Sequence, residues 1–340
     1  MKSRAMISRA IKWGMLLTLS CDLAQASGVI VIAHRGASGY LPEHTLEAKA
    51  LAIGMDADYV EQDVVLTRDD VPIVTHDITL EDVSDIASHF PGRARADGHY
   101  YAIDFTIAEL KTLWRHERTA ADHSRVFPGR FPATTPGSAI VTLAEEIDFV
   151  QGINQSTGRN VGLYTEVKYP AWHRGQGKDI TRIVLDALRT HGYSKRSDKV
   201  FFQCFDAEEL KRVHTQLKSE LKLIQLIGEN SWHESSVDYE TMMTERGIAE
   251  VARYADGIGP EIAQLVEWPT AGGKARIKPL AALAKAHGLL MHPYTLRIDS
   301  LPPNAPSTTA VLDALFNGVK VDGLFSDFPD VVVRYRNGHP

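Results

Sequence analysis

The chain has 340 residues, of which 44% are hydrophobic and 24% are charged. This composition is typical of a soluble globular protein, and it excludes a collagen, a coiled coil or a largely disordered chain. The length suits one large domain or two ordinary ones.

The first 26 residues have the pattern of a secretory signal peptide. Four basic residues by position 12 precede a short apolar run at 13–19, which is too short to span a membrane comfortably. Ala24-Gln25-Ala26 has the small-x-small pattern of a cleavage site. We therefore expect a periplasmic protein that begins at Ser27 after cleavage, with an uncleaved membrane anchor as the alternative.

Cleavage at this site changes the charge and the cysteine count. It leaves 33 basic and 42 acidic residues, a net charge of about −9, which argues against nucleic acid as a partner. A small anionic substrate then needs a local cation or an arginine to offset this charge. Cys204 is the one cysteine that remains, so we expect no internal disulfide. Because cleavage also removes the apolar run at 13–19, we expect no stable membrane insertion of the mature protein.

Short apolar runs alternate with helical patterns along the chain, which predicts βαβ units and a parallel sheet. The expected strands are 29–33, 59–65, 72–75, 161–167, 199–204, 221–227, 255–258, 289–292 and 321–325, and the expected helices are 43–53, 143–151, 180–191, 207–217, 280–287 and 309–317. About eight such units predict an α/β fold, a (β/α)8 barrel of the TIM type.

Nine strands are one too many for this barrel. The link at 67–71 is too short for a crossover helix, so the second and third runs are expected to depart from the barrel as a hairpin, although the pattern does not settle which strand is extra. Residues 80–136 interrupt the alternation of strand and helix patterns and contain one helical pattern, at 107–116. We expect them to form an inserted subdomain or a cover over the active site, within a barrel domain at 27–340.

Three carboxylates lie on expected strands that should be apolar on both faces. Glu61 and Asp63 share one face of the second strand, and Glu166 lies near the end of the fourth. Buried charges cost several kcal/mol unless they are paired or metal-bound. The pattern indicates a site for Ca²⁺ or Mg²⁺; an ion-pair network with Arg35 and Lys168 is the alternative.

Two histidines follow predicted strands, His34 after the first and His76 after the third. At equivalent positions of the barrel mouth they can serve as a general acid and a general base. Arg35 has the planar fork that binds phosphate oxygens. Gln203, Phe205 and Tyr294, at later strand ends, are expected to line the same pocket with a hydrogen-bonding group and an aromatic wall.

Taken together, these residues resemble the motifs of the glycerophosphodiester phosphodiesterase family. The motifs that carry the resemblance follow in family order: His34-Arg35-Gly36-Ala37, Pro42-Glu43-His44-Thr45, Glu61-Gln62-Asp63-Val64, His76-Asp77, Glu166-Val167-Lys168, Gln203-Cys204-Phe205-Asp206, His292-Pro293-Tyr294-Thr295 and Ser326-Asp327-Phe328-Pro329. The later motifs, together with residues 95–105, resemble the periplasmic bacterial branch. The resemblance covers nearly all of the chain after position 26.

The resemblance implies a (β/α)8 barrel with an inserted segment and a bound divalent cation, Ca²⁺ in the periplasmic branch. It implies hydrolysis of deacylated phospholipids, such as glycerophosphocholine and glycerophosphoethanolamine, to sn-glycerol 3-phosphate and an alcohol. The implied roles are acid–base catalysis by His34 and His76, cation binding by Glu61, Asp63 and Glu166, and phosphate binding by Arg35 and Lys168. His44, where many relatives have Asn, is expected to affect only helix capping.

Two other functions stay open at this stage. One is a phospholipase D-like or C-like enzyme on a similar barrel, which would expose an apolar loop to a membrane. The other is an exported binding barrel without catalysis, which the presence of all seven implied residues disfavours. The sequence does not fix the oligomeric state, so a homodimer stays open.

Overall fold

The computed structural model describes residues 28–132, 137–270 and 272–338. The predicted signal peptide at 1–26 lies outside these residues. Within the described ranges, no helix is both long and apolar enough to cross a membrane.

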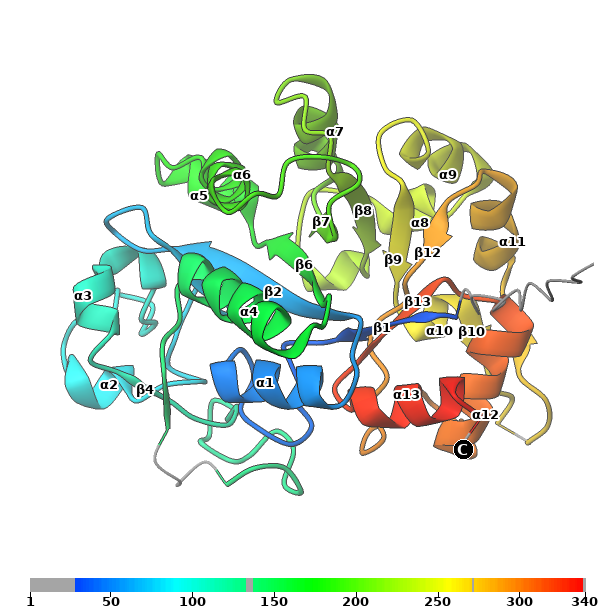
Figure 1. Ribbon diagram of the computed structural model, residues 1–340, viewed down its shortest axis with the longest axis horizontal. Helices are drawn as coiled ribbons and strands as arrows, with labels where there is room; N and C mark the ends of the chain where they lie inside the picture. The colour runs from blue at the N-terminus through cyan, green and yellow to red at the C-terminus, as the bar shows by residue number, and fades with distance from the viewer. Residues whose placement is uncertain (1–27, 133–136, 271, 339–340) are drawn as a thin grey trace, which may run out of the picture.

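Parallel strands form a barrel at the centre of the molecule (Figure 1). In spatial order they are β12 (Leu290–Met291), β9 (Gly257–Pro260), β8 (Lys222–Ile227), β7 (Val200–Cys204), β6 (Gly162–Val167), β2 (Tyr59–Leu66), β1 (Ile30–Ala33) and β13 (Gly323–Ser326). Between β12 and β13 the barrel closes through single hydrogen bonds, such as that from the Asp322 N–H to the Met291 carbonyl at 3.0 Å. This nearly closed ring confirms the predicted (β/α)8 barrel.

Helices cover the outside of the barrel and bury aliphatic side chains against the strands. They are α1 (Leu46–Gly54), α4 (Leu143–Thr157), α5 (Pro170–Gly175), α6 (Ile180–Thr190), α7 (Ala207–Thr215), α8 (Tyr239–Met242), α9 (Glu245–Val251), α10 (Ile262–Leu265), α11 (Pro279–Ala286), α12 (Thr308–Asp313) with the π-helical turn η3 (Ala314–Val319), and α13 (Pro329–Arg336). The turn η2 (Asn230–Trp232) and the short strands β10 (Val266–Glu267) and β11 (Arg276–Ile277) lie in loops.

Aromatic side chains fill the barrel interior below its carboxyl end. Tyr59, Tyr164, Phe201 and Phe325 belong to one buried cluster there. Two residues further along each strand, on the same face, the interior becomes polar, as with Glu61 after Tyr59. This apolar layer stabilises the barrel and lies directly beneath the polar residues at its carboxyl end.

The extra strand is β3 (Pro72–Val74). It pairs antiparallel with β2, with Val64 opposite Val74, so the two strands form the expected hairpin. The expectation that His76 occupies a barrel position equivalent to that of His34 is wrong, because β3 is not one of the parallel strands of the ring. His76 still reaches the barrel mouth because β3 runs back along β2 and the Thr75 N–H donates to the Asp63 carbonyl at 2.8 Å.

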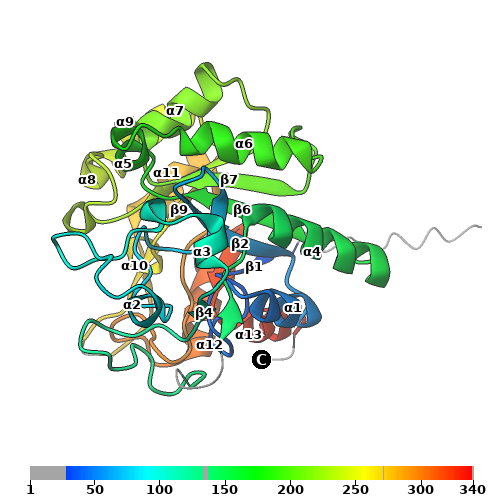
Figure 2. The same cartoon turned by 90° about the vertical axis from the view of Figure 1, so that its left-hand side faces the viewer.

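The chain between β3 and α4 contains short elements beside β2 and α1 (Figure 2). They are α2 (Ile86–His89), η1 (Ala102–Asp104), α3 (Ile107–Leu110), β4 (Trp114–Arg115) and β5 (Ser138–Ala139). Residues of α2, η1 and α3 share a small apolar core with Val65 and Ile73. The helix predicted over 107–116 is wrong beyond Leu110. The chain becomes extended there because the fully buried Arg115 donates to the carbonyls of Glu43 and Val74.

Candidate active site

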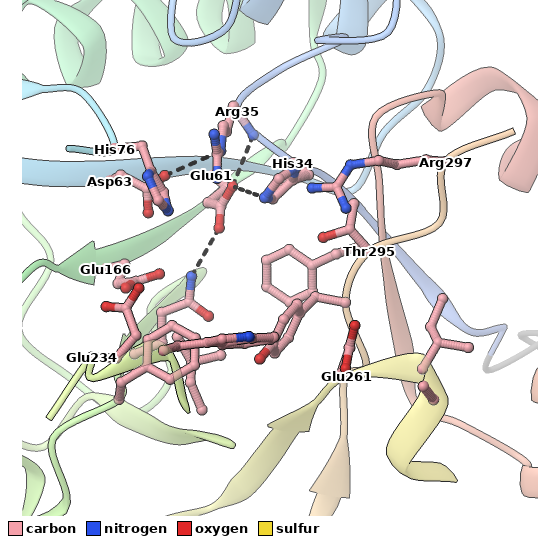
Figure 3. Close-up of a pocket in the computed structure, with 18 of the residues that line it drawn as sticks. His34, Arg35, Glu61, Asp63, His76, Glu166, Glu234, Glu261, Thr295 and Arg297 are labelled. Atoms are coloured by element: carbon pink, nitrogen blue, oxygen red, sulfur yellow. Dashed lines mark hydrogen bonds and ion pairs between the residues drawn. The ribbon is translucent and has the colours of Figure 1, made fainter. Parts of the chain in front are cut away.

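A cavity of about 560 Å³ opens at the carboxyl end of the barrel (Figure 3). Every site residue that the sequence predicted lines it: His34, Arg35, Glu61, Asp63, His76, Glu166, Lys168, Gln203, Phe205 and Tyr294. They come from strands and turns that are widely separated in sequence. The carboxyl end is also where barrel enzymes place their active sites.

The three predicted cation ligands form one cluster. Asp63 lies opposite Glu166 in the β2–β6 ladder, and Glu61 shares the face of Asp63. One oxygen from each of the three carboxylates lies within 4.8 Å of the others, and all three side chains are buried. Burial and the charge of Asp63 raise the pKa of Glu61 to about 8.

This cluster suits a divalent cation with oxygen ligands. Asp63 Oδ1 is buried and has no hydrogen-bond partner, which leaves an acceptor free for a cation. Ion pairs are present as well, with Lys168 Nζ at 2.8 Å from Glu166 and Arg35 Nε at 3.5 Å from Asp63. The ion pairs with Lys168 and Arg35, which the sequence offered as an alternative to a cation site, are therefore present in the carboxylate cluster, but they leave Asp63 Oδ1 unused.

His34 follows β1 and faces the cavity. Its Nδ1 lies 2.6 Å from Asp327 Oδ1, and its Nε2 lies 3.8 Å from Glu61 Oε2. Burial, together with the charge of Arg35, lowers the pKa of His34 to about 4. The imidazole is therefore neutral at pH 7 and able to accept a proton.

His76 has the same arrangement from the other side of the cavity mouth. Its Nδ1 lies 2.6 Å from Asp77 Oδ1, and its Nε2 lies 3.4 Å from Lys168 Nζ. Burial lowers the pKa of His76, and the charges of Arg35 and Lys168 lower it further. In both histidines a carboxylate holds Nδ1, which leaves Nε2 for the cavity.

The two predicted phosphate-binding cations are held by carboxylates. Arg35 has a φ of 58°, and its N–H donates to Glu61 Oε2 at 2.8 Å. Its guanidinium donates to Glu43 at 3.0 Å. Lys168 is buried between Glu166 and Glu234, at 2.8 and 3.7 Å. Both cations line the cavity and are available to an anionic ligand.

Of the remaining predicted residues, Gln203 contacts a candidate cation ligand, and Phe205 and Tyr294 form an aromatic wall of the cavity. Gln203 Nε2 donates to Glu61 Oε1 at 3.1 Å, so Gln203 orients a candidate cation ligand. The rings of Phe205 and Tyr294 pack edge to face with their centroids 6.0 Å apart. The Tyr294 hydroxyl donates to the Ile227 carbonyl at 2.8 Å, so its ring, not its hydroxyl, faces a ligand.

Several residues of this site were not predicted from the sequence. The expectation that His44 affects only helix capping is wrong: Thr45 caps α1, and buried His44 places its Nε2 2.8 Å from Asp63 Oδ2. Glu234 and Arg297 also line the cavity, and none of the sequence motifs includes them. An isolated charged residue in a loop offered no pattern that could have identified it.

Comparison with known proteins decides the family. The model of the glycerophosphoryl diester phosphodiesterase family matches residues 34–331. The chain belongs to this family. A glycerophosphodiester phosphodiesterase of Haemophilus influenzae is 41% identical over 330 residues, 92% of this chain and 91% of the relative. One of Treponema pallidum is 36% identical over 329 residues, 91% of this chain and 92% of the relative.

Solved structures of phosphodiesterases share the fold. A putative glycerophosphoryl diester phosphodiesterase from Silicibacter pomeroyi has a TM-score of 0.69 at 22% identity, covering 92% of this chain and 94% of its own. An Oleispira antarctica phosphodiesterase, solved in complex with the product sn-glycerol-3-phosphate, has a TM-score of 0.60 at 19% identity, covering 91% and 97%. The prediction of a phosphodiesterase of this family is confirmed, whereas its periplasmic branch stays a prediction.

Proposed function

We propose that this enzyme hydrolyses glycerophosphodiesters, including glycerophosphocholine and glycerophosphoethanolamine, to sn-glycerol 3-phosphate and an alcohol. One observation carries the proposal. Two neutral histidines, each held at Nδ1 by a carboxylate, face one cavity that also contains two cationic side chains and a carboxylate cluster. Such a cavity offers proton transfer and phosphate binding in one place.

Glu61, Asp63 and Glu166 would hold the cation, which we propose to be Ca²⁺, with Mg²⁺ as the alternative. Two observations support this proposal. Asp63 Oδ1 is buried and has no hydrogen-bond partner. Burial raises the pKa of the neighbouring carboxyl groups of Glu61 and Glu166 and so favours their protonated forms. When bound, the cation supplies positive charge that neutralises a phosphate oxygen. His44 and Gln203 orient the ligands on the protein side.

Arg35 and Lys168 are proposed to bind the phosphate oxygens and to counter the charge that develops there. One histidine removes a proton from the attacking oxygen, and the other protonates the oxygen of the leaving alcohol. The attacker is water, or a substrate hydroxyl that first forms a cyclic phosphate. His34 is buried and His76 is half-buried, and each has a carboxylate partner at Nδ1, so either can serve as the acid or as the base.

The signal-like pattern at 1–26 supports export to the periplasm, where we propose that the enzyme acts. A substrate of low molecular mass would then reach the open end of the barrel from solution. Fractionation of cells that express the full chain tests this: the processed protein in the periplasmic fraction supports it, and an unprocessed protein in the cytoplasmic fraction contradicts it.

The reaction is tested by measuring glycerol 3-phosphate released from glycerophosphocholine by purified residues 27–340. Chelation should abolish release, and Ca²⁺ or Mg²⁺, restored separately, should return it. Release that survives chelation would contradict the cation requirement. Release from vesicles of intact lysophospholipid, without release from glycerophosphocholine, would favour the phospholipase alternative.

A further inference from the structure

The segment between β3 and α4 places one arginine behind each of the two histidines, the half-buried Arg118 behind His76 and the buried Arg130 behind His34. Asp77 uses Oδ1 for His76, and its Oδ2 accepts from Arg118 Nη1 at 2.6 Å. Asp327 uses Oδ1 for His34, and its Oδ2 accepts from Arg130 Nη2 at 2.7 Å. The same His–Asp–Arg arrangement therefore occurs twice, and both arginines come from one stretch of chain.

Arg118 also joins His76 to the other side of the site. Its Nε and Nη2 donate to the two oxygens of Glu43 at 3.0 and 2.7 Å. Glu43 in turn accepts from Arg35 Nη1 at 3.0 Å. One guanidinium thus holds the carboxylate behind a candidate proton-transfer group and the carboxylate behind a candidate phosphate-binding group.

The backbone around Arg118 is anchored to β3, to the turn before α1 and to its own segment. Arg115 is fully buried and donates to the carbonyls of Glu43 and Val74 at 3.3 and 2.9 Å. The His116 N–H donates to the Val83 carbonyl at 3.0 Å. Since a guanidinium is a rigid planar fork, an anchored Arg118 fixes the planes of both carboxylates that it binds.

Arg130 is held in a similar way but is not alone. Its Nε and Nη2 contact Asp299 at 2.8 and 3.1 Å, and its guanidinium lies 3.6 Å from the centroid of the Phe127 ring. Asp327 also accepts from Arg297 Nε at 3.0 Å. Loss of Arg130 therefore leaves Asp327 with a second arginine, whereas Arg118 is the guanidinium that the structure records on Asp77.

We propose that residues 80–132 act as a positioning element for catalysis, with Arg118 setting the orientation of His76 and Arg35, and Arg130 contributing to that of His34. The inference rests on the proposed roles of these histidines. The arginines touch no reacting atom; they act through Asp77, Glu43 and Asp327. A cover over the cavity, by contrast, would need no arginine at these two positions.

The test compares Arg118→Ala, His76→Ala and the double variant in the glycerophosphocholine assay at saturating cation. Arg118→Ala should lower kcat/KM about 10- to 100-fold, the usual effect of removing a residue that orients a functional one. In the His76→Ala background the same substitution should lower kcat less, because His76, one of the two groups that Arg118 orients, is gone and only the effect through Glu43 and Arg35 remains. Retention of its full effect on kcat there overturns the inference.

Chemical rescue separates positioning from folding. Guanidinium ion, added far below denaturing concentrations, should restore part of the activity of Arg118→Ala, whereas methylammonium should not, because a point charge cannot bind two carboxylates as a fork. For the same reason Arg118→Lys should stay impaired. A loss of activity that guanidinium does not restore, in a variant that unfolds at the wild-type temperature, contradicts the inference.

Arg95→Ala is the matched control. Arg95 lies in the same segment and makes a two-point ion pair with Asp104, at 2.6 and 2.8 Å, but no contact with the cavity. Its removal should leave kcat and KM near wild type, and Arg130→Ala should fall between the two variants. Equal losses in Arg95→Ala and Arg118→Ala would overturn the inference. Wild-type turnover in His76→Ala would instead refute the proposed function of that histidine, and the inference with it.

Discussion

His44 Nε2 lies 2.8 Å from Asp63 Oδ2, and both side chains are buried. Because the partner is a carboxylate, the imidazole N–H is the donor. The contact fixes the orientation of Asp63 and leaves its Oδ1 without a hydrogen-bond partner. His44 therefore orients a candidate cation ligand, although it contributes no group to the cavity itself.

We expect His44→Ala to weaken the affinity for the activating cation by about 10- to 100-fold, because the supporting hydrogen bond is lost. The measurement is glycerophosphocholine turnover against free Ca²⁺ concentration. His44→Asn is the matched control, since Asn retains an N–H donor and tolerates the φ of 58° at this position. An unchanged cation dependence in His44→Ala would contradict this role.

The turn after His34 should not tolerate a side chain at Gly36. Gly36 has a φ of 91°, and a Cβ there would lie 2.9 Å from the Ala48 carbonyl carbon. We expect Gly36→Ala to destabilise the protein by roughly 1–3 kcal/mol. Denaturant unfolding measures this, with Gly152→Ala in α4 as the control, because a Cβ at that glycine contacts nothing. Equal stabilities of the two variants would contradict the prediction.

Stability should fall in acid because of His292. Burial lowers the pKa of this histidine from 6.5 to about 3 in the folded protein, and its Nδ1 accepts from the Tyr164 hydroxyl at 2.7 Å. Below about pH 6.5, His292 therefore binds a proton in the unfolded chain but stays neutral in the folded protein. This favours unfolding, by roughly 2 kcal/mol at about pH 5.

The check is to compare wild type and His292→Asn by denaturant unfolding at about pH 7.5 and pH 5. The variant is expected to be less stable at pH 7.5, but it should lose roughly 2 kcal/mol less than wild type on acidification. His214→Gln, at an exposed position of α7, should retain the wild-type pH dependence. An identical loss in His292→Asn and wild type would show that this ring is not the cause.

Strand alternation was enough to predict the centre of the site. Glu61 and Asp63 stand two residues apart, so their side chains had to share a face wherever that strand lay. The ladder register then places Asp63 opposite Glu166. Parallel strands also bring their carboxyl ends to one edge, which accounts for the convergence of His34 and Gln203 on the same cavity.

Contacts made across long stretches of sequence could not be predicted in this way. The short link at 67–71 predicted the hairpin of β2 and β3, but the pattern did not settle which of the two strands is the extra one. Arg118 lies 75 residues from Glu43 in a segment without periodicity, and only the tertiary structure brings them together. The role of His44 was wrongly predicted because its position at the start of the predicted helix 43–53 suggested a local role, whereas its partner belongs to β2.

The most direct test of the account is the turnover of glycerophosphocholine by wild type, His34→Ala and His76→Ala at saturating cation. If each histidine transfers a proton, each variant should lose at least about 10²-fold in kcat while its unfolding temperature stays near that of the wild type. Near-normal kcat in either variant would remove that residue from the mechanism and contradict catalysis by a histidine pair.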